Sequence, residues 1–117
     1  MATYSKVLLS GSTQGKGIKV VQTATAGTTI HTACTGTSNM DEIWLYAMNT
    51  SASAVTLTLE WGEATAPDGN IIVALPAQSG LILVSPGLLL QNELVVKAFA
   101  SAANVVTIHG FINRITV

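Results

Sequence analysis

Hydrophobic and polar residues alternate along most of the chain, with almost no helical period. In the clearest stretch, Val55–Trp61, valine, leucine and tryptophan occupy every second position, and threonine and glutamate lie between them. Successive side chains of a β-strand point to opposite faces, so this stretch predicts an antiparallel strand with one buried face. Ile43–Met48 is apolar at both sets of positions. It predicts a central strand whose second face is covered by another sheet or another subunit.

Turn-forming residues divide the chain at intervals of about ten residues. Ala66–Asn70 contains a proline and a glycine and predicts a tight turn. Asn49–Ser53 and Ser101–Asn104 predict short loops that each close a hairpin between the strands on either side. The predicted strands are Ile18–Gln22, Thr28–Thr32, Ile43–Met48, Val55–Trp61, Ile71–Leu75, Gly80–Val84, Leu94–Phe99 and Val105–Ile112.

About eight short strands with regular spacing predict an all-β fold, an antiparallel β-sandwich with jelly-roll or Greek-key topology. Residues 1–17 differ from the rest, because one short apolar run lies among serine, threonine, glycine and glutamine. They predict a flexible N-terminal arm ahead of a β-sandwich domain of residues 18–117. The alternative is that they form an edge strand and a loop of the same sandwich.

Charge is scarce in this chain. Only 9% of the residues are charged, compared with about 25% in ordinary soluble domains, and 49% are hydrophobic. No apolar run approaches the roughly 20 residues that a membrane helix needs, and no cluster of cations points to nucleic acid. Large exposed apolar patches are rare on monomers, so the composition predicts surface hidden against neighbouring protein subunits.

The N-terminal glycines do not form a phosphate-binding loop. Three residues separate Gly11 from Gly15, whereas that loop has four, and Gly17 stands where a hydroxyl should bind the metal. The β-prone residues that follow do not begin a helix. No nucleotide cofactor is expected.

Histidine and cysteine are too few for a metal site or a recognisable catalytic nucleophile. His31 and Cys34 lie close in sequence, but a zinc site needs three or four ligands with local spacing. Cys34 has no cationic neighbour and no second cysteine, so we expect a buried apolar thiol and no disulfide. His109 shares a predicted strand face with Phe111 and is expected to be half exposed or at an interface. We predict no metal, no cofactor and no enzyme activity.

Paired acidic residues offer one further candidate site. Asp41 and Glu42 open a predicted strand, where carboxylates are expected to stay in water. Glu60 and Glu63 flank Trp61 at a strand end, and a tryptophan beside acids can stack on a sugar ring. A carbohydrate-binding module is therefore an alternative function. The competing interpretation is that Trp61 ends the inward-facing row of its strand and belongs to the core.

The stretch from Asp41 to Arg114 resembles small structural proteins of tailed-bacteriophage virions. Few charges, threonine-rich strands and Asn-Thr-Ser turns carry the resemblance. They occur in Glu42–Ser51, Val55–Gly62, Ile72–Gly80, Lys97–Val105 and Gly110–Ile115.

The resemblance implies a capsid decoration (cement) protein on the outer surface of the virion, made in the bacterial host cytoplasm. Such proteins commonly form oligomers, often trimers, and bind the major capsid protein. A tail, neck or fibre-associated subunit is the alternative within the same class. The resemblance implies no catalytic residue.

Two groups of residues are expected to bind protein partners, with neither nucleic acid nor membrane involved. The predicted arm would dock on the capsid, and the second face of Ile43–Met48 would serve oligomerisation or sheet packing. The residues are Tyr4, Lys6, Val7, Leu8, Leu9 and Lys16 in the arm, and Trp44 and Tyr46 on the strand.

Overall fold

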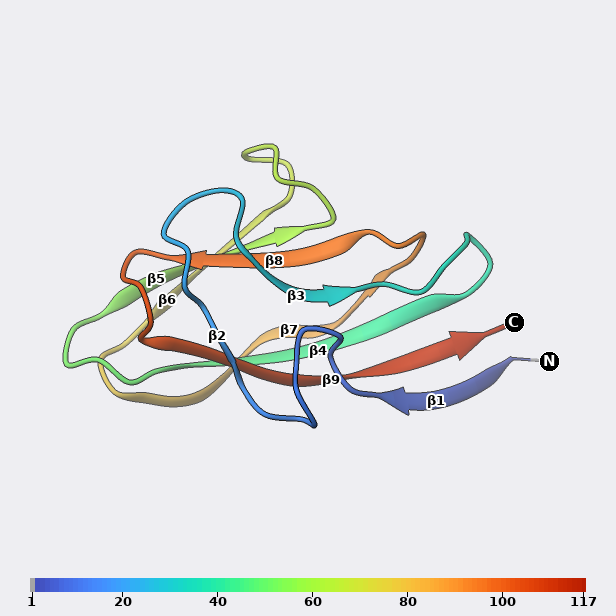
Figure 1. The fold of residues 1–117 in the computed structure, drawn as a ribbon, viewed down its shortest axis with the longest axis horizontal. Coiled ribbons are helices and arrows are strands. Elements are labelled where there is room, and N and C mark those ends of the chain that lie inside the picture. Colours follow the sequence, from blue (N-terminus) through green and yellow to red (C-terminus); the bar gives the residue numbers. More distant parts are fainter. Residues whose placement is uncertain (1) are drawn as a thin grey trace.

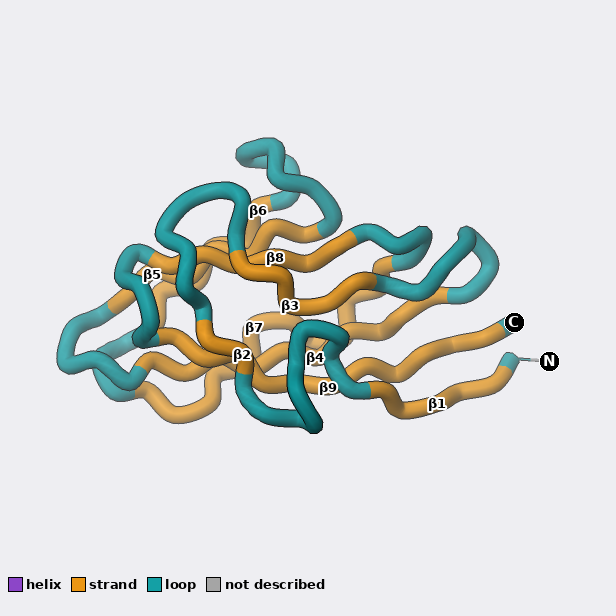
Figure 2. The backbone as a smooth tube through the Cα atoms, in the orientation of Figure 1, coloured by secondary structure: helices purple, strands orange, loops and turns teal. Residues whose placement is uncertain are grey.

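The computed structural model describes residues 2–117, and the regular structure in that range consists of β-strands (Figures 1 and 2). The strands are β1 (Thr3–Val7), β2 (Ile18–Lys19), β3 (Thr28–Thr32), β4 (Met40–Asn49), β5 (Val55–Trp61), β6 (Asn70–Leu75), β7 (Ser79–Leu90), β8 (Val95–Ala100) and β9 (Val106–Thr116). All the predicted strands are present, and β3 and β5 have the predicted bounds. The all-β prediction is confirmed.

The strands form two antiparallel sheets. Sheet A has the order β1-β9-β4-β7, with β2 also pairing with β9, and sheet B has the order β3-β8-β5-β6. Figure 1 shows the sheets from the side, with β3 and β8 of sheet B above β4, β9 and β1 of sheet A. The first and last strands, β1 and β9, pair at one end of the molecule, with Thr3 opposite Thr116. The predicted β-sandwich is confirmed.

Strand pairing is nested along the chain. β5 pairs with β6, β4 with β7, β3 with β8, and both β1 and β2 with β9. The chain is therefore one long antiparallel hairpin, with its tip between β5 and β6, rolled into two layers. This is the double Greek-key path of a jelly roll, one of the two predicted topologies.

The two predicted hairpins are wrong. β4 lies in sheet A and β5 in sheet B, and β8 and β9 are divided between the sheets in the same way. Residues 50–54 and 101–105 carry the chain from one sheet to the other. Asn49 fixes the first crossing, because its buried side-chain amide donates to the carbonyl oxygens of Ser53 and Pro76. Turn-forming residues show where the chain bends, but not which sheet it enters next.

The core fills the space between the two sheets. β4 contributes Ile43, Leu45 and Ala47, and β5 contributes Leu57 and Leu59; all five are completely buried. Burial of a side chain of leucine size contributes about 1.5–3 kcal/mol to folding. In β5 the alternation of hydrophobic and polar positions correctly identified the inward row.

The N-terminal segment belongs to the sandwich, and a flexible arm is not what the structure shows. Residues 3–7 pair with β9, and Leu9 is only 2% exposed in the core. The backbone N–H of Gly11 donates to the Ile30 carbonyl oxygen at 3.0 Å. These contacts match the alternative of an edge strand and a loop. Met1, the first residue of the predicted arm, lies outside the described residues.

One loop covers the outward side of sheet B. Thr58 and Glu60 occupy the outward row of β5, yet they are only 6% and 1% exposed. The Glu60 carboxylate accepts hydrogen bonds from the Gly27 backbone N–H at 2.7 Å and from the Thr25 hydroxyl. The predicted water-facing row of this strand is therefore buried at one end, because residues 25–27 cross over it.

Candidate functional site

A buried polar network connects four segments of the chain. Asp41, at the start of β4, is 0% exposed, and the N–H groups of Arg114 (2.8 and 3.0 Å), His31 (2.7 Å) and Cys34 (3.2 Å) donate to its carboxylate. His31 is 1% exposed, and its Nδ1 atom accepts from the Ser10 backbone N–H at 3.0 Å. The prediction that the Asp41 carboxylate stays in water is wrong, because Arg114 of β9 supplies a paired charge inside the sheet.

The hydrogen bonds fix the protonation state of this network. A backbone N–H can only donate, so the Nδ1 atom of His31 carries no proton and the ring donates from Nε2 to Asp41. Burial lowers the pKa of His31, against the opposing effect of Asp41. Burial alone would raise the pKa of Asp41, but the hydrogen bonds from Arg114 and His31 outweigh it and hold that pKa below its usual value. At neutral pH the network holds neutral His31 and the Arg114–Asp41 ion pair.

Ser10, His31 and Asp41 contain the residue types of a nucleophilic triad but not its geometry. A triad needs the serine hydroxyl to donate to the imidazole nitrogen. Here that nitrogen accepts from the Ser10 backbone, and the hydroxyl oxygen of Ser10 accepts from the Thr32 N–H at 2.7 Å. Cys34 is buried as predicted, and burial raises the pKa of its thiol. The network therefore holds segments together rather than activating a nucleophile.

Acidification is expected to destabilise the fold in two steps. In the unfolded chain His31 binds a proton below a pH of about 6.5, whereas in the folded chain its lower pKa keeps it neutral. The stability contributed by neutral His31 is complete above that pH and is lost as the pH falls toward the folded pKa. A second loss begins below a pH of about 4, where unfolded aspartate becomes protonated.

Urea unfolding at several pH values tests this expectation. The unfolding midpoint should fall between pH 7 and about pH 5.5 in the natural chain and in His109→Gln, because His109 lies outside the network. In His31→Gln the dependence over this range should disappear. A midpoint that stays constant in the natural chain would contradict the assignment.

The outward side of sheet A carries the second notable group of residues, which we call the outer face. β4 places Ile43, Leu45 and Ala47 in the core, so its alternate residues point outward. Cross-strand pairing adds residues from β1, β2, β9 and β7 to the same side. The outer face includes Tyr4, Lys6, Lys19, Met40, Glu42, Trp44, Tyr46, Met48, Leu83, Leu89, Thr107, His109, Phe111, Asn113 and Ile115.

The middle of the outer face is a rigid aromatic group. The rings of Trp44 and Phe111 stack with centroids 6.1 Å apart, and the Lys6 ammonium lies 4.6 Å from the centroid of the Phe111 ring. The Trp44 indole N–H donates to Glu42 at 2.7 Å, and the Asn113 amide donates to the same oxygen at 2.9 Å. Those two hydrogen bonds lower the pKa of Glu42, the one from Trp44 contributing most. Contacts with neighbouring side chains thus hold Lys6 and Glu42 on the outer face, and Lys19, opposite Thr107, is a second cation on the same side.

The residues predicted to bind partners do not all reach the surface. Tyr4 is 72% exposed, Leu8 is 54% exposed, and Lys6 and Lys16 are also exposed. Trp44 and Tyr46 are half buried on the outer face, and no further sheet formed by residues 2–117 covers them. Val7 packs against the core, and Leu9 is buried within it, so Leu9 presents no side chain to a partner.

Sequence reasoning missed part of the outer face. Leu83 and Leu89 of β7 are 46% and 53% exposed, although their strand looks like an ordinary buried run. Phe111 was recognised only as a neighbour of His109, which is half buried as expected. Register supplies the missing signal, since Leu83 lies opposite Tyr46 and Leu89 opposite Glu42. A single sequence without strand pairing does not contain that information.

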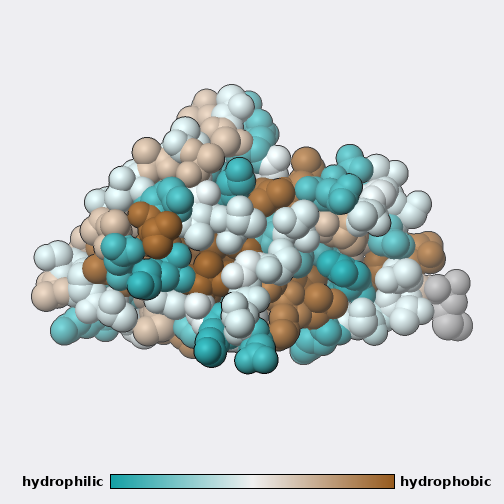
Figure 3. All heavy atoms as spheres, in the orientation of Figure 1, coloured by the Kyte–Doolittle hydropathy of each residue, from teal (hydrophilic) through white to brown (hydrophobic). Residues whose placement is uncertain are grey.

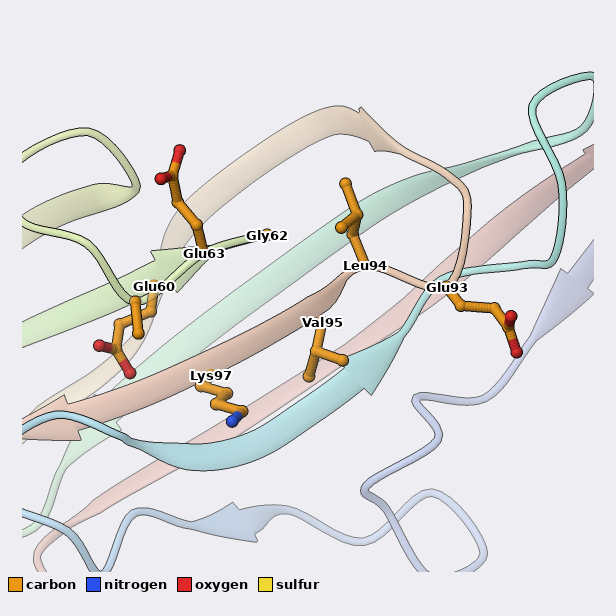
Figure 4. A pocket seen from close by; sticks show the side chains of 8 residues that line it. Glu60, Gly62, Glu63, Glu93, Leu94, Val95 and Lys97 are labelled. Atoms are coloured by element: carbon orange, nitrogen blue, oxygen red, sulfur yellow. The ribbon is translucent and has the colours of Figure 1, made fainter.

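A cavity of about 250 Å³ lies near the end of β5, beside the residues considered for sugar binding. Glu60, Glu63, Glu93 and Lys97 line it, together with small and apolar residues. Figure 4 shows the carboxylates of Glu63 and Glu93 pointing in opposite directions, and Glu60 is already engaged by Thr25 and Gly27. Three carboxylates therefore line the cavity without converging on a ligand.

Trp61 does not line this cavity. It is half buried and packs against the hydrophobic core, as the competing interpretation predicted. Within residues 2–117, no group of histidine, cysteine and acidic side chains is arranged to hold a metal ion. The same residues include no helix that is long and apolar enough to cross a membrane.

Seen from the side of β1, β2 and β3, the surface is mostly neutral or apolar, and strongly hydrophilic residues form small separate groups (Figure 3). Comparison with known proteins adds no assignment to these features. No protein-family model matches the chain, and no curated protein or solved structure shows significant similarity to it.

Proposed function

We propose that this chain is a non-enzymatic structural subunit, a decoration (cement) protein that binds the assembled capsid of a tailed bacteriophage and stabilises it as an oligomer. The observation that carries the proposal is the outer face. It is a rigid, largely apolar sheet surface, with Trp44 and Phe111 at its centre and no covering layer in the described chain.

Composition supports an assembly role. The centres of protein interfaces are depleted in charge and enriched in aromatic residues, and arginine is the only charged type that is favoured there. This chain has 9% charged residues, and Tyr4, Trp44, Tyr46 and Phe111 share one face. The resemblance of residues 41–114 to virion structural proteins points to a capsid as the larger assembly.

The nested sandwich suits a protein that resists mechanical load. Each strand of sheet A except the edges is hydrogen-bonded on both sides, and the core locks the two sheets together. A subunit that binds the assembled lattice but not free capsid protein stabilises the lattice by mass action. Jelly-roll domains occur in viral capsids and in lectins, but that is a fold-level analogy and does not select between them.

Particular contacts weigh against the sugar-binding alternative. Trp61 packs on the core, so its ring offers no free face beside the cavity. On the outer face, Trp44 covers one side of Phe111 and Lys6 lies over that ring as well. A sugar needs a free aromatic face to stack on, and these contacts occupy Phe111 and keep Trp61 away from the cavity.

Co-sedimentation with virus particles tests the proposal. The purified chain should bind saturably to intact capsids of the phage that carries its gene, and it should raise the temperature at which those capsids release DNA. It should not bind unassembled capsid protein. Binding restricted to isolated tails or necks would replace the decoration role by a tail or neck role, and binding to a glycan array without capsid binding would overturn both.

A further inference from the structure

We infer that the outer face binds a second copy of this chain through a two-fold, face-to-face contact in which Lys6 of each copy meets the partner's Glu42. This inference rests on the proposed assembly role and names the self-association surface. It is carried by the positions of Lys6 and Glu42 on the face and by the apolar residues beside them.

Lys6 and Glu42 lie in one row across three strands. Lys6 of β1 pairs in register with Asn113 of β9, which pairs with Glu42 of β4. Two strand spacings, about 10 Å, separate the two backbones, and the described residues form ion pairs only at Asp41, not between Lys6 and Glu42. Glu42 is fixed by its hydrogen bonds from Trp44 and Asn113, so its charge has a defined position.

A two-fold axis parallel to β9, lying between two facing copies, exchanges the two ends of this row. It places Lys6 of one copy over the partner's Glu42, and the reciprocal pair forms at the same time. The neighbouring row contains Tyr4 and Met40 on either side of β9, and the same axis brings Tyr4 over the partner's Met40. In these two rows opposite charges therefore meet, and apolar side chains meet apolar side chains.

The axis along β9 decides which strands meet. β9 faces the partner's β9 and β1 faces the partner's β4, so β7 lies at the margin of the contact. Because β1 has only five residues, the overlapping strands cover about 300 Å² before side-chain relief is counted. Stable protein interfaces bury about 800 Å² per partner, so we expect a weak dimer that forms as the concentration rises. Sheets that pack face to face align their strands within about 30°, which keeps the rows in register near the axis.

The β7 edge of sheet A is a poorer candidate for self-association. β7 is the free edge of sheet A beside β4, and it contains Pro86, which has no N–H to donate. Its pairing with β4 shifts register at three places, and such bulges turn an edge away from further pairing. The exposed leucines of this strand, Leu83 and Leu89, contribute to the outer face instead.

Light scattering on the free chain gives the first test. The mass should approach twice the 12.1-kDa mass of one chain as the concentration rises. A monomer at all concentrations would overturn the inference, and so would a trimer, because one face paired with itself closes as a dimer. Neither result would decide whether the chain binds capsids, because co-sedimentation measures binding to assembled particles.

Charge reversal gives the decisive test. In Lys6→Glu every contact in the pair becomes Glu against Glu, and in Glu42→Lys it becomes Lys against Lys, so each variant alone should self-associate at least about tenfold more weakly. An equimolar mixture of the two variants restores both contacts, because one chain carries two anions and the other two cations. The mixture should form a heterodimer as tightly as the natural chain self-associates.

The controls separate this geometry from general damage. Glu63→Lys makes the same charge change at an exposed position outside the outer face and should leave the dimer unchanged. Tyr4→Asp alters a 72% exposed side chain, so it keeps the fold and should weaken the dimer by placing a carboxylate against the partner's Met40. A mixture of the two charge variants that stays monomeric, or a Tyr4→Asp chain that dimerises normally, overturns the two-fold contact.

Discussion

Replacing Asp41 by asparagine is expected to lower the free energy of unfolding by about 3–5 kcal/mol, because it removes one partner of a buried ion pair. Both carboxylate oxygens act only as acceptors. Their donors are the N–H groups of His31, Cys34 and Arg114, which uses two nitrogens. In either orientation of the asparagine amide, its NH₂ group would face at least one of those N–H donors, and two donors cannot form a hydrogen bond with each other. The buried donors of His31 and Cys34 cannot reach water to compensate.

Urea unfolding of Asp41→Asn at neutral pH measures this loss. Asp68→Asn is a matched control, because Asp68 is exposed in the turn between β5 and β6, and its effect should stay within about 0.5 kcal/mol. Asp41→Asn should also remove the destabilisation below about pH 4 that we assign to this carboxylate. A loss of less than about 1 kcal/mol would mean that the network contributes little to the fold.

The Asp41 network shows where sequence reasoning fails. An acid at the start of a strand is normally solvated, and nothing near Asp41 in the chain suggests a partner. His31 is 10 residues away, and Arg114 is 73 residues away. Only the pairing of β9 with β4 brings the arginine opposite this position. Long-range pairing creates the site, so local patterns do not contain it.

Local patterns did identify the strands themselves. Val55–Trp61 alternates strictly because one face packs on the core, and the pattern located that strand to the residue. β1 escaped because its residues, Thr3 to Lys6, are exposed on both faces and show no alternation. Its place depends on backbone pairing with β9, which no side-chain pattern records. The outer face was predicted only in part. Trp44 and Tyr46 were predicted to lie on it, but Phe111 and the leucines of β7 were not.

Replacing Gly110 by alanine is expected to destabilise the fold by about 3 kcal/mol or more. A Cβ atom at this position of β9 would lie 2.1 Å from the Trp44 carbonyl oxygen and 3.1 Å from the Leu45 Cα atom. Both atoms belong to the backbone of β4, which is hydrogen-bonded to β9 on one side and β7 on the other. A side chain could rotate away from a new methyl group, but the backbone of β4 is held by its pairing with β7 and β9 and cannot shift without breaking hydrogen bonds.

Gly80→Ala supplies the matched control and should act in the opposite direction. Gly80 lies in β7, and no atom would lie within 4 Å of its Cβ. Alanine is more stable than glycine in a strand by about 0.5–1 kcal/mol, so Gly80→Ala should slightly raise the free energy of unfolding. If both variants behave alike in urea unfolding, the close approach of β4 and β9 at Gly110 is not a constraint on the fold.

The same close approach connects the fold to the outer face. Gly110 precedes Phe111 on β9, and Trp44 lies opposite Phe111 on β4, so the distance between these two backbones sets the stacking of the rings. Pushing the strands apart should loosen that stack and the Glu42 side chain that hydrogen-bonds to Trp44. Gly110→Ala should therefore weaken self-association as well as stability, whereas Gly80→Ala should leave the dimer intact. Tryptophan fluorescence can be measured at urea concentrations where both variants remain folded. It should change in Gly110→Ala, because the environment of Trp44 changes before unfolding begins.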